Sequence, residues 1–316
     1  MKYRQLGFFR LFCDDSLFSD YPIRESSDST SDLFDIYFYD NDCNLMEKII
    51  FEEEQGKIND FTASYDLVNK YCEIRGYNDE LLFKLLVKAH EAQIIQINKT
   101  LKNSVIEEII YSICIPVISF LNDNFIPFHG TTLVKGKNMI VILADSNVGK
   151  STLSAYLMKK HDFQLITDDI SILKLNESNP VISSLGHNVR LREDSFMYLS
   201  DYFQYDSKHL KNNKYHIMLK DNVGLIENRK ISFFFLEESE IYKKIKGMET
   251  LKSYIKLCKS LYAPSLAIPK LISDKNNLIF NKMKEFNISF YELPYVKKFE
   301  MIEIIASGLE NVLNLM

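Results

Sequence analysis

Residues Met139–Thr152 read MIVILADSNVGKST. The first five, MIVIL, are apolar without alternation, which predicts a strand that is buried on both faces of a sheet. The loop that follows ends in the sequence GKST, and a helix is predicted from Lys150 to about Lys160. A buried strand, a tight loop and a helix in this order are typical of a phosphate-binding loop in an α/β fold.

The loop matches the pattern G-x-x-x-x-G-K-[ST] at its end and departs from it at its first position, where Ala144 replaces glycine. Backbone N–H groups of such a loop, together with the helix N-terminus, bind phosphate. Lys150 can reach the β- and γ-phosphates, and the Ser151 hydroxyl can ligate Mg²⁺. These features predict binding of a nucleoside triphosphate with magnesium, Mg-ATP above all. The residues expected to bind it are Asp145, Ser146, Asn147, Val148, Gly149, Lys150, Ser151 and Thr152.

Two adjacent carboxylates, Asp168 and Asp169, follow a short apolar strand predicted at Gln164–Ile166. In open α/β sheets, ligands bind at the carboxyl ends of the strands. One carboxylate there can hold Mg²⁺, directly or through water, and the other can take a proton from an attacking hydroxyl group. The pair therefore extends the predicted phosphate site to a site for phosphoryl transfer.

The rest of the chain is predicted to form a small, mostly β N-terminal domain, residues 1–102, and an α/β domain, residues 103–316. Strands are expected at Leu33–Tyr39, Glu47–Phe51, Phe61–Tyr65, Lys70–Ile74, Thr131–Val134, Ile170–Leu175, Ile231–Leu236 and Phe290–Leu293. Helices are expected at Asn103–Leu121, Glu249–Leu261, Lys275–Phe286 and Phe299–Leu313. The apolar stripe of the first helix is Val105, Ile109, Ile110, Ile113, Val117 and Phe120.

Composition argues against several classes of protein. The formal net charge of -5 is unlike that of a general nucleic-acid binder, which usually has a basic face. The longest apolar run, Ile109–Leu121, contains Pro116 and is shorter than the roughly 20 residues that a membrane span needs. No apolar segment typical of a signal peptide follows Met1. We therefore expect a cytoplasmic protein with neither nucleic acid nor membrane as a partner.

A longer stretch from Phe128 to Leu173 reads FHGTTLVKGKNMIVILADSNVGKSTLSAYLMKKHDFQLITDDISIL. It resembles the catalytic core of the HPr serine kinase/phosphorylase family, which combines a histidine motif, a strand pair, a D-S-x-x-G-K-S loop, a helix and a strand ending in a double aspartate. The resemblance is closer to the shorter HPr-kinase-like branch, which includes kinases of lasso-peptide precursors. It implies a P-loop kinase core of the HPr kinase type, a mixed sheet with flanking helices.

The resemblance also implies roles for individual residues. Lys150 and the loop amides would bind the phosphates, and Ser151 and Asp169 would hold the metal. Asp168 would be the general base, with His129 beside it to orient it. In the segment NVRLRED that follows, two further residues, Arg190 and Arg192, would neutralise charge on the transferred phosphoryl group.

One departure from the family limits the expected chemistry. Thr152 stands where bifunctional HPr kinases usually carry glutamate, so the reverse phosphorylase reaction is not expected. The implied function is that of an ATP-dependent serine kinase that uses Mg²⁺ and acts on a peptide or small protein, such as a ribosomally made lasso-peptide precursor.

Two alternatives stay open from the sequence. The first is a kinase of a free small molecule such as an amino acid. The second is a nucleotide-binding regulatory or assembly protein without transfer activity, which the Ala144 departure allows. HPr kinases are hexamers, so the resemblance also leaves a homo-oligomer open.

Overall fold

The structure is a computed structural model that describes residues 2–6, 9–13, 17, 23–25, 33–39, 54–58, 61–76, 79–145, 147–175, 180–184, 188–199, 205–211, 214–219, 230–262, 267–286 and 288–315. The chain forms two compact units. The first unit comprises Met1–Pro127 and Tyr262–Leu278, and the second comprises Phe128–Leu261 and Ile279–Met316. Each unit has its own mixed sheet, so the protein has the mixed α/β character that the sequence predicts.

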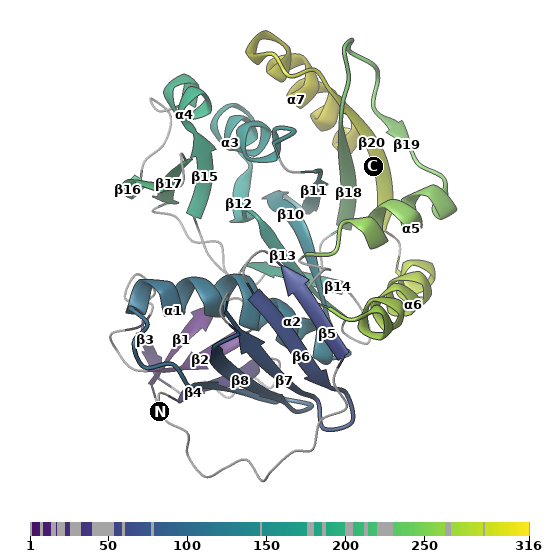
Figure 1. Cartoon of the computed structure of the whole chain (residues 1–316). Coiled ribbons are helices and arrows are strands. Elements are labelled where there is room, and N and C mark those ends of the chain that lie inside the picture. The colour runs from purple at the N-terminus through teal and green to yellow at the C-terminus, as the bar shows by residue number, and fades with distance from the viewer. Residues whose placement is uncertain are drawn as a thin grey trace. The chain divides into compact units, whose positions relative to one another are not determined.

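Within the described residues, the first unit is built on a nine-stranded sheet (Figure 1). Its strands are β1 (Lys2–Leu6), β2 (Phe9–Phe12), β3 (Ile23–Glu25), β4 (Phe34–Tyr39), β5 (Glu54–Ile58), β6 (Phe61–Asp66), β7 (Tyr71–Arg75), β8 (Leu81–Val87) and β9 (Glu91–Gln96). They lie in the order β3-β1-β2-β4-β9-β8-β7-β6-β5. The strands predicted in β4, β6 and β7 are confirmed. The strand predicted at Glu47–Phe51 lies outside the described residues.

The helical segment Asn103–Leu121 belongs to the first unit. It consists of α1 (Asn103–Ile109), a π-helical turn (Ile110–Cys114) and α2 (Ile115–Leu121). The next residue, Asn122, donates its side-chain amide to the carbonyl oxygens of Lys88 and Ala89 in the same unit. The division between the units therefore differs from the boundary predicted at residue 102, because this helical segment groups with the N-terminal sheet.

Two expectations for this segment need correction. Val105, placed in the apolar stripe, is 40% exposed, because it lies in the first turn, before the buried part of the helix begins. The segment Asn103–Leu121 also has the length and hydropathy of a membrane-spanning helix, although the shorter apolar run appeared too short. Within the protein, 67% of that apolar window is buried, as in the core helix of a folded domain.

The second unit contains the stretch with the phosphate-loop pattern. Its sheet strands are β10 (Phe125–Lys135), β11 (Asn138–Leu143), β12 (Gln164–Thr167), β13 (Ile170–Leu175), β14 (Pro180–Ser184), β18 (Lys230–Glu238), β19 (Lys246–Gly247) and β20 (Ser289–Tyr295). A separate antiparallel sheet holds β15 (Asn188–Arg192), β16 (Tyr205–Lys211) and β17 (Lys214–Leu219). The helices are α3 (Lys150–Lys160), α4 (Glu193–Leu199), α5 (Thr250–Lys259) and α7 (Phe299–Asn314). Helix α6 (Pro269–Glu285) begins in the first unit and ends in the second, because the division falls between Leu278 and Ile279. Each strand and helix predicted in this part of the chain is present, and β13 and α3 have the predicted bounds, while the others have shifted ends.

The pairing of the strands brings several loops to one edge of the main sheet. Described strands follow the order β14-β13-β10-β11-β18-β20-β19, and β12 also pairs with β10. Strands β11, β18 and β20 are parallel, while β11 and β12 are each antiparallel to β10. The carboxyl ends of β11, β12 and β20 therefore point the same way. A ligand at this edge would meet the residues that follow all three strands.

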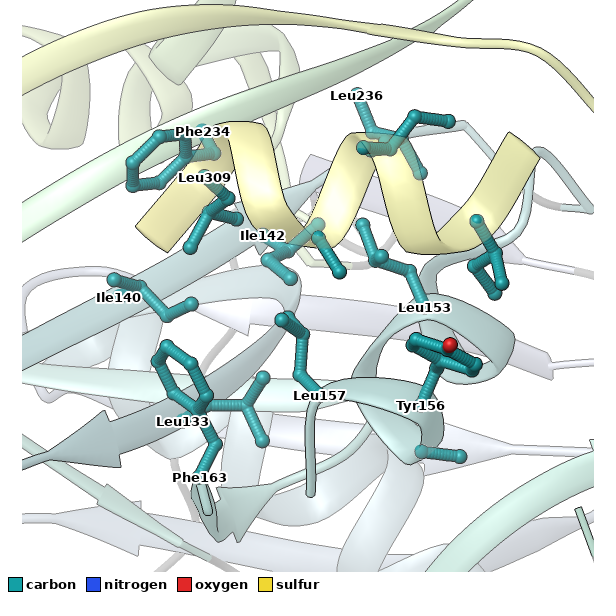
Figure 2. Packing of buried hydrophobic residues seen from close by; sticks show 14 of the residues in the cluster. Leu133, Ile140, Ile142, Leu153, Tyr156, Leu157, Phe163, Phe234, Leu236 and Leu309 are labelled. Atoms are coloured by element: carbon teal, nitrogen blue, oxygen red, sulfur yellow. The ribbon is translucent and has the colours of Figure 1, made fainter. Parts of the chain in front are cut away.

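Helices α3 and α7 pack their apolar faces on this sheet (Figure 2). Leu153 and Leu157 of α3 and Leu309 of α7 are fully buried. They meet Ile140 and Ile142 of β11, whose MIVIL segment is buried on both faces as predicted. The strand and the helix that flank the loop are thus held in one core, which fixes the loop between them.

Candidate functional site

The loop between β11 and α3 depends on two residues with positive φ. Asn147 has φ 69° and Gly149 has φ 127°, in a region that residues with a side chain seldom adopt. A Cβ atom at Gly149 would lie 2.7 Å from Cε1 of Tyr295, the last residue of β20. Glycine is therefore required here both for its backbone conformation and for the close approach of an aromatic ring.

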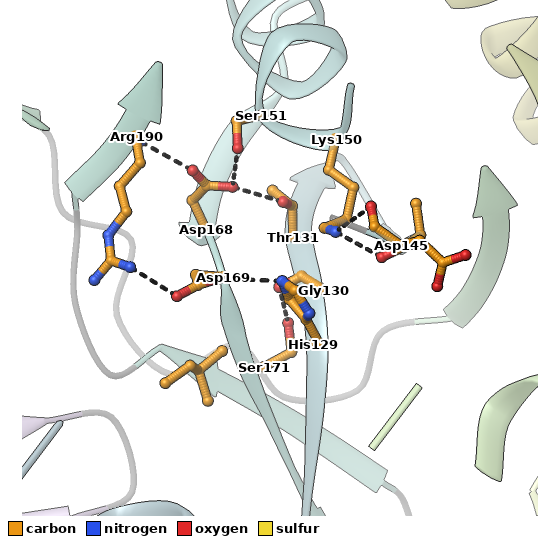
Figure 3. Close-up of polar contacts among 12 residues, drawn as sticks. His129, Gly130, Thr131, Asp145, Lys150, Ser151, Asp168, Asp169, Ser171 and Arg190 are labelled. Carbon is orange, nitrogen blue, oxygen red and sulfur yellow. Dashed lines mark hydrogen bonds and ion pairs between the residues drawn. The ribbon is translucent and has the colours of Figure 1, made fainter. Parts of the chain in front are cut away.

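Lys150 lies at the start of α3 and is 8% exposed. Its Nζ donates hydrogen bonds to the backbone oxygens of Ala144, at 2.6 Å, and Asp145, at 3.3 Å (Figure 3). The lysine thus reaches across the loop to its first residues. This position places its positive charge beside the N-terminus of α3, where an anion is favoured.

Asp168 is buried and accepts three hydrogen bonds (Figure 3). Its Oδ1 accepts from Thr131 Oγ1 at 2.7 Å and from Ser151 Oγ at 3.1 Å. Its Oδ2 accepts from the backbone N–H of Arg190 at 3.0 Å. Burial raises the pKa of the Asp168 carboxyl above its ordinary value, although the hydrogen bonds from Arg190 and Thr131 act against burial.

Asp169 faces a different set of partners. Its φ of 100° turns the chain sharply after β12. Its Oδ1 lies 3.2 Å from Nε2 of His129, and its Oδ2 accepts from Arg190 Nη1 at 2.8 Å. Burial acts to raise the pKa of Asp169, but the hydrogen bond from His129 and the charge of Arg190 outweigh it, so the pKa lies below its ordinary value.

The two aspartates have different partners, and His129 contacts Asp169 rather than Asp168, the residue that the family resemblance implied it would orient. Asp168 contacts Ser151, the hydroxyl expected at the metal, and is 3% exposed. The side chain of Asp169 is 22% exposed, is ionised at neutral pH and pairs with His129, which was expected to orient Asp168. Either carboxylate can take a proton from a hydroxyl group that reaches it, and Asp169 is the more exposed of the two.

A cavity of about 380 Å³ joins these groups. The predicted site residues that line it are His129, Asn147, Gly149, Lys150, Ser151, Thr152, Asp168, Asp169, Arg190 and Arg192. Two predicted residues are outside the lining: Asp145 is exposed, and the side chain of Val148 packs against the hydrophobic core. Ser146 lies outside the described residues. The two arginines alternate along β15 with the buried Val189 and Leu191, which directs both toward the cavity.

Several lining residues were missed by the sequence analysis. They are Asp194 and Ser195 at the start of α4, and Tyr295, Lys297, Lys298 and Phe299 between β20 and α7. Thr131, which holds Asp168, was also missed. A signal for Thr131 exists, since it lies two residues after His129 on β10 and hence on the same face. For the turn after β20, the signal is its place at the carboxyl end of a predicted strand.

Comparisons with known proteins add little to this description. No protein-family model matches the chain, and no curated protein matches it. Among solved structures, the chain is similar to the HPr(Ser) kinase/phosphatase from Coxiella burnetii, with a TM-score of 0.31 and 13% identity over 59% of this chain and 89% of that chain. A likeness at this level supports no assignment of function, which has to come from the residues of the site.

Proposed function

We propose that this protein is an ATP-dependent kinase that transfers the γ-phosphoryl group to a hydroxyl of a peptide or small protein. The hydrogen bond between Ser151 and Asp168 supports this most strongly, because it joins the phosphate loop to the double aspartate. His129 and Arg190 complete the same cavity. Phosphoryl transfer needs positioning and charge neutralisation more than covalent help, and these side chains are of the required types.

The residues fit a magnesium nucleotide. Magnesium prefers oxygen ligands and usually keeps several waters, so one or two protein oxygens suffice. Ser151 Oγ and Asp168 Oδ1 are 3.1 Å apart and provide them. Bound there, Mg²⁺ would neutralise charge on the β- and γ-phosphates. The amides of the loop, the N-terminus of α3 and Lys150 would bind the phosphate oxygens.

In the proposed reaction, the acceptor oxygen forms a bond to the γ-phosphorus while the bond to the β,γ-bridging oxygen breaks, and ADP leaves. The acceptor proton passes to the Asp169 carboxylate, which His129 orients. Arg190, whose Nη1 contacts Asp169, and Arg192 would balance the negative charge of the transferred group. Asp168 and Ser151 would hold the metal during the transfer.

The acceptor class rests on the resemblance to lasso-peptide precursor kinases. A transfer assay would identify it: the protein is incubated with Mg²⁺, γ-labelled ATP and a size-fractionated extract of the source cells. We expect labelled material of peptide or small-protein size. Label in a small molecule would instead identify the alternative acceptor, and ATP binding without any transfer would favour a regulatory protein.

Variants in the same assay test the roles of the aspartates. Asp169→Asn is expected to lower transfer by roughly 10²- to 10⁴-fold, the usual contribution of a general base, while Mg-ATP still binds. Asp168→Asn is expected to raise the magnesium concentration that is needed for ATP to bind. Asp274→Asn, an exposed aspartate of α6, is the control and should behave as wild type. Near-normal transfer by Asp169→Asn would contradict this assignment and would identify Asp168 as the general base.

A further inference from the structure

The cavity has two walls of different chemistry, on opposite sides of the strand that carries the phosphate loop. Strand β10, next to β11 on one side, contributes His129, and β12 beyond it leads into the two aspartates. On the other side, β18 and then β20 follow β11, and β20 ends at Tyr295. The first wall is ionic, while the second is formed by the turn Tyr295–Phe299.

The chemistry of the first wall orients a triphosphate. Ser151 and Asp168 would hold the metal, and a metal there would balance the charge of the β- and γ-phosphates. Asp169, His129 and Arg190 lie on the same side, where the transferred group would meet its acceptor. The nucleoside is at the other end of the triphosphate, and the turn Tyr295–Phe299 lies on the other side of β11 from these groups.

The second wall offers an aromatic surface and positive charge. Phe299 lines the cavity and is partly exposed. Its ring stacks on Tyr198 of α4, with centroids 4.5 Å apart and planes at 24°. Lys297 and Lys298 are exposed beside it and also line the cavity. Purine rings stack readily on such aromatic faces, and lysines bind phosphate.

The turn is also held against the loop. The Tyr295 ring packs on Gly149, as its closeness to a Cβ atom there shows. On the α4 side, Ser195 Oγ and Thr152 Oγ1 share a hydrogen bond of 2.9 Å, which ties α4 to the first turn of α3. The aromatic pair of Tyr198 and Phe299 thus has a fixed position relative to the loop.

We propose that the turn between β20 and α7 is the nucleoside subsite, in which the base stacks on Phe299 and the two lysines face the α-phosphate. This inference rests on the proposed function, since it needs a triphosphate at the loop. It assigns a binding role to residues at the far end of the sequence from the loop motif, and it leaves the acceptor side of the cavity free for the substrate hydroxyl.

Two ligands separate the subsite from the phosphate site: Mg-ATP, and magnesium with inorganic tripolyphosphate, which lacks a nucleoside. Titration calorimetry of Phe299→Ala should show ATP affinity lowered about tenfold, the effect of losing one base–aromatic stack, and tripolyphosphate affinity unchanged. Leu251→Ala, an exposed apolar residue of α5 with 67% exposure, should leave both affinities unchanged.

A fluorescence experiment gives an independent readout, because the chain contains no tryptophan. Phe299→Trp introduces one fluorophore at the subsite, and Leu251→Trp introduces one away from it. We expect Mg-ATP to quench the emission of Phe299→Trp and tripolyphosphate to leave it unchanged. The emission of Leu251→Trp should respond to neither ligand.

The outcomes are distinct. Equal ATP affinities of Phe299→Ala and wild type would overturn the subsite. An equal loss of affinity for ATP and for tripolyphosphate would also overturn it, because the turn would then act on the phosphates. Failure of the triphosphate site, on which the proposed function rests, has another signature: wild type itself would bind neither ATP nor tripolyphosphate. Failure of the transfer reaction alone would appear only in the transfer assay.

Discussion

The two aspartates that follow β12 are neighbours in sequence but have opposite electrostatic environments. The pKa of Asp168 is raised by burial, while that of Asp169 is lowered by His129 and Arg190 against the effect of burial. Their partners differ: Asp168 accepts from the hydroxyl groups of Thr131 and Ser151, whereas Asp169, which has a positive φ, contacts His129 and Arg190. Carboxylates whose pKa values are pushed apart are typical of sites that perform proton transfer.

The raised pKa of Asp168 predicts a pH-dependent stability. A carboxyl with a higher pKa in the folded state stabilises the fold when protonated, and that contribution is lost as pH rises through the folded pKa. In Asp168→Asn, the amide can accept from the Arg190 N–H and donate to the hydroxyls of Thr131 and Ser151, so the contacts are kept. We therefore expect the variant to gain stability over wild type as pH rises above about 4, the ordinary carboxyl value.

Thermal unfolding of both proteins between acidic and neutral pH measures this difference. The melting temperature of Asp168→Asn minus that of wild type should grow with pH. A difference that is constant, or that falls as pH rises, would contradict the raised pKa.

At the level of elements, α7 holds the core beneath the phosphate loop. Its Leu309 is fully buried in the cluster with α3 and β11, whereas Ile304 on the same helix is 46% exposed. Leu309→Ala is expected to cost about 2–5 kcal/mol of unfolding free energy, because it leaves a cavity in a packed core. Ile304→Ala is the matched control and should cost much less.

Chemical denaturation of both variants tests this expectation. If Leu309→Ala lost no more unfolding free energy than Ile304→Ala, α7 would not be packed as described. Mg-ATP affinity should fall for Leu309→Ala only as far as its folded fraction falls.

The elements around the loop could be predicted because their signals are local. The MIVIL run, the GKS sequence and the aspartates after Gln164–Ile166 each carry a pattern within a few residues. The helix predicted from Lys275 begins at Pro269 instead, although proline in the first turn is itself a helix-start signal.

Other parts of the site could not be predicted, because they depend on contacts between distant residues. The packing of Tyr295 on Gly149 and the stacking of Tyr198 with Phe299 each join separate elements. The pairing of His129 with Asp169 joins β10 to the residues after β12, and no local pattern indicates which of the two aspartates His129 contacts. A sequence gives the composition of such a site more readily than its contacts.

At the level of the whole molecule, the chain enters its first unit twice, since Tyr262–Leu278 joins Met1–Pro127. Lys275 of α6 is 2% exposed and donates from Nζ to the backbone oxygen of Asn122. This contact ties the returning segment to the end of the helical segment Asn103–Leu121. A fragment that begins at residue 103 or 128 would separate these parts of the first unit, so we expect such fragments to expose apolar surface.

Burial lowers the pKa of Lys275 to about 7 from an ordinary value of 10.5. Between these values the unfolded chain binds more protons at this site than the folded chain, so stability should rise with pH in that window. Raising the pH from about 7 to about 9 should therefore stabilise wild type relative to Lys275→Met.

The control for this prediction is Lys270→Met, which removes an exposed lysine of the same helix. It should show the pH dependence of wild type in urea denaturation. If Lys275→Met kept that dependence as well, the lysine would not be neutral in the folded protein.

The most direct test of the whole account is calorimetric titration of the wild-type protein and Lys150→Ala with Mg-ATP. Lys137→Ala, an exposed lysine in the turn before β11, is the control. We expect wild type and Lys137→Ala to bind Mg-ATP alike, and Lys150→Ala to bind it roughly ten- to a hundredfold more weakly, as for the loss of a hydrogen bond to a charged group. No binding to wild type, or equal binding to all three proteins, would contradict a triphosphate site at this loop.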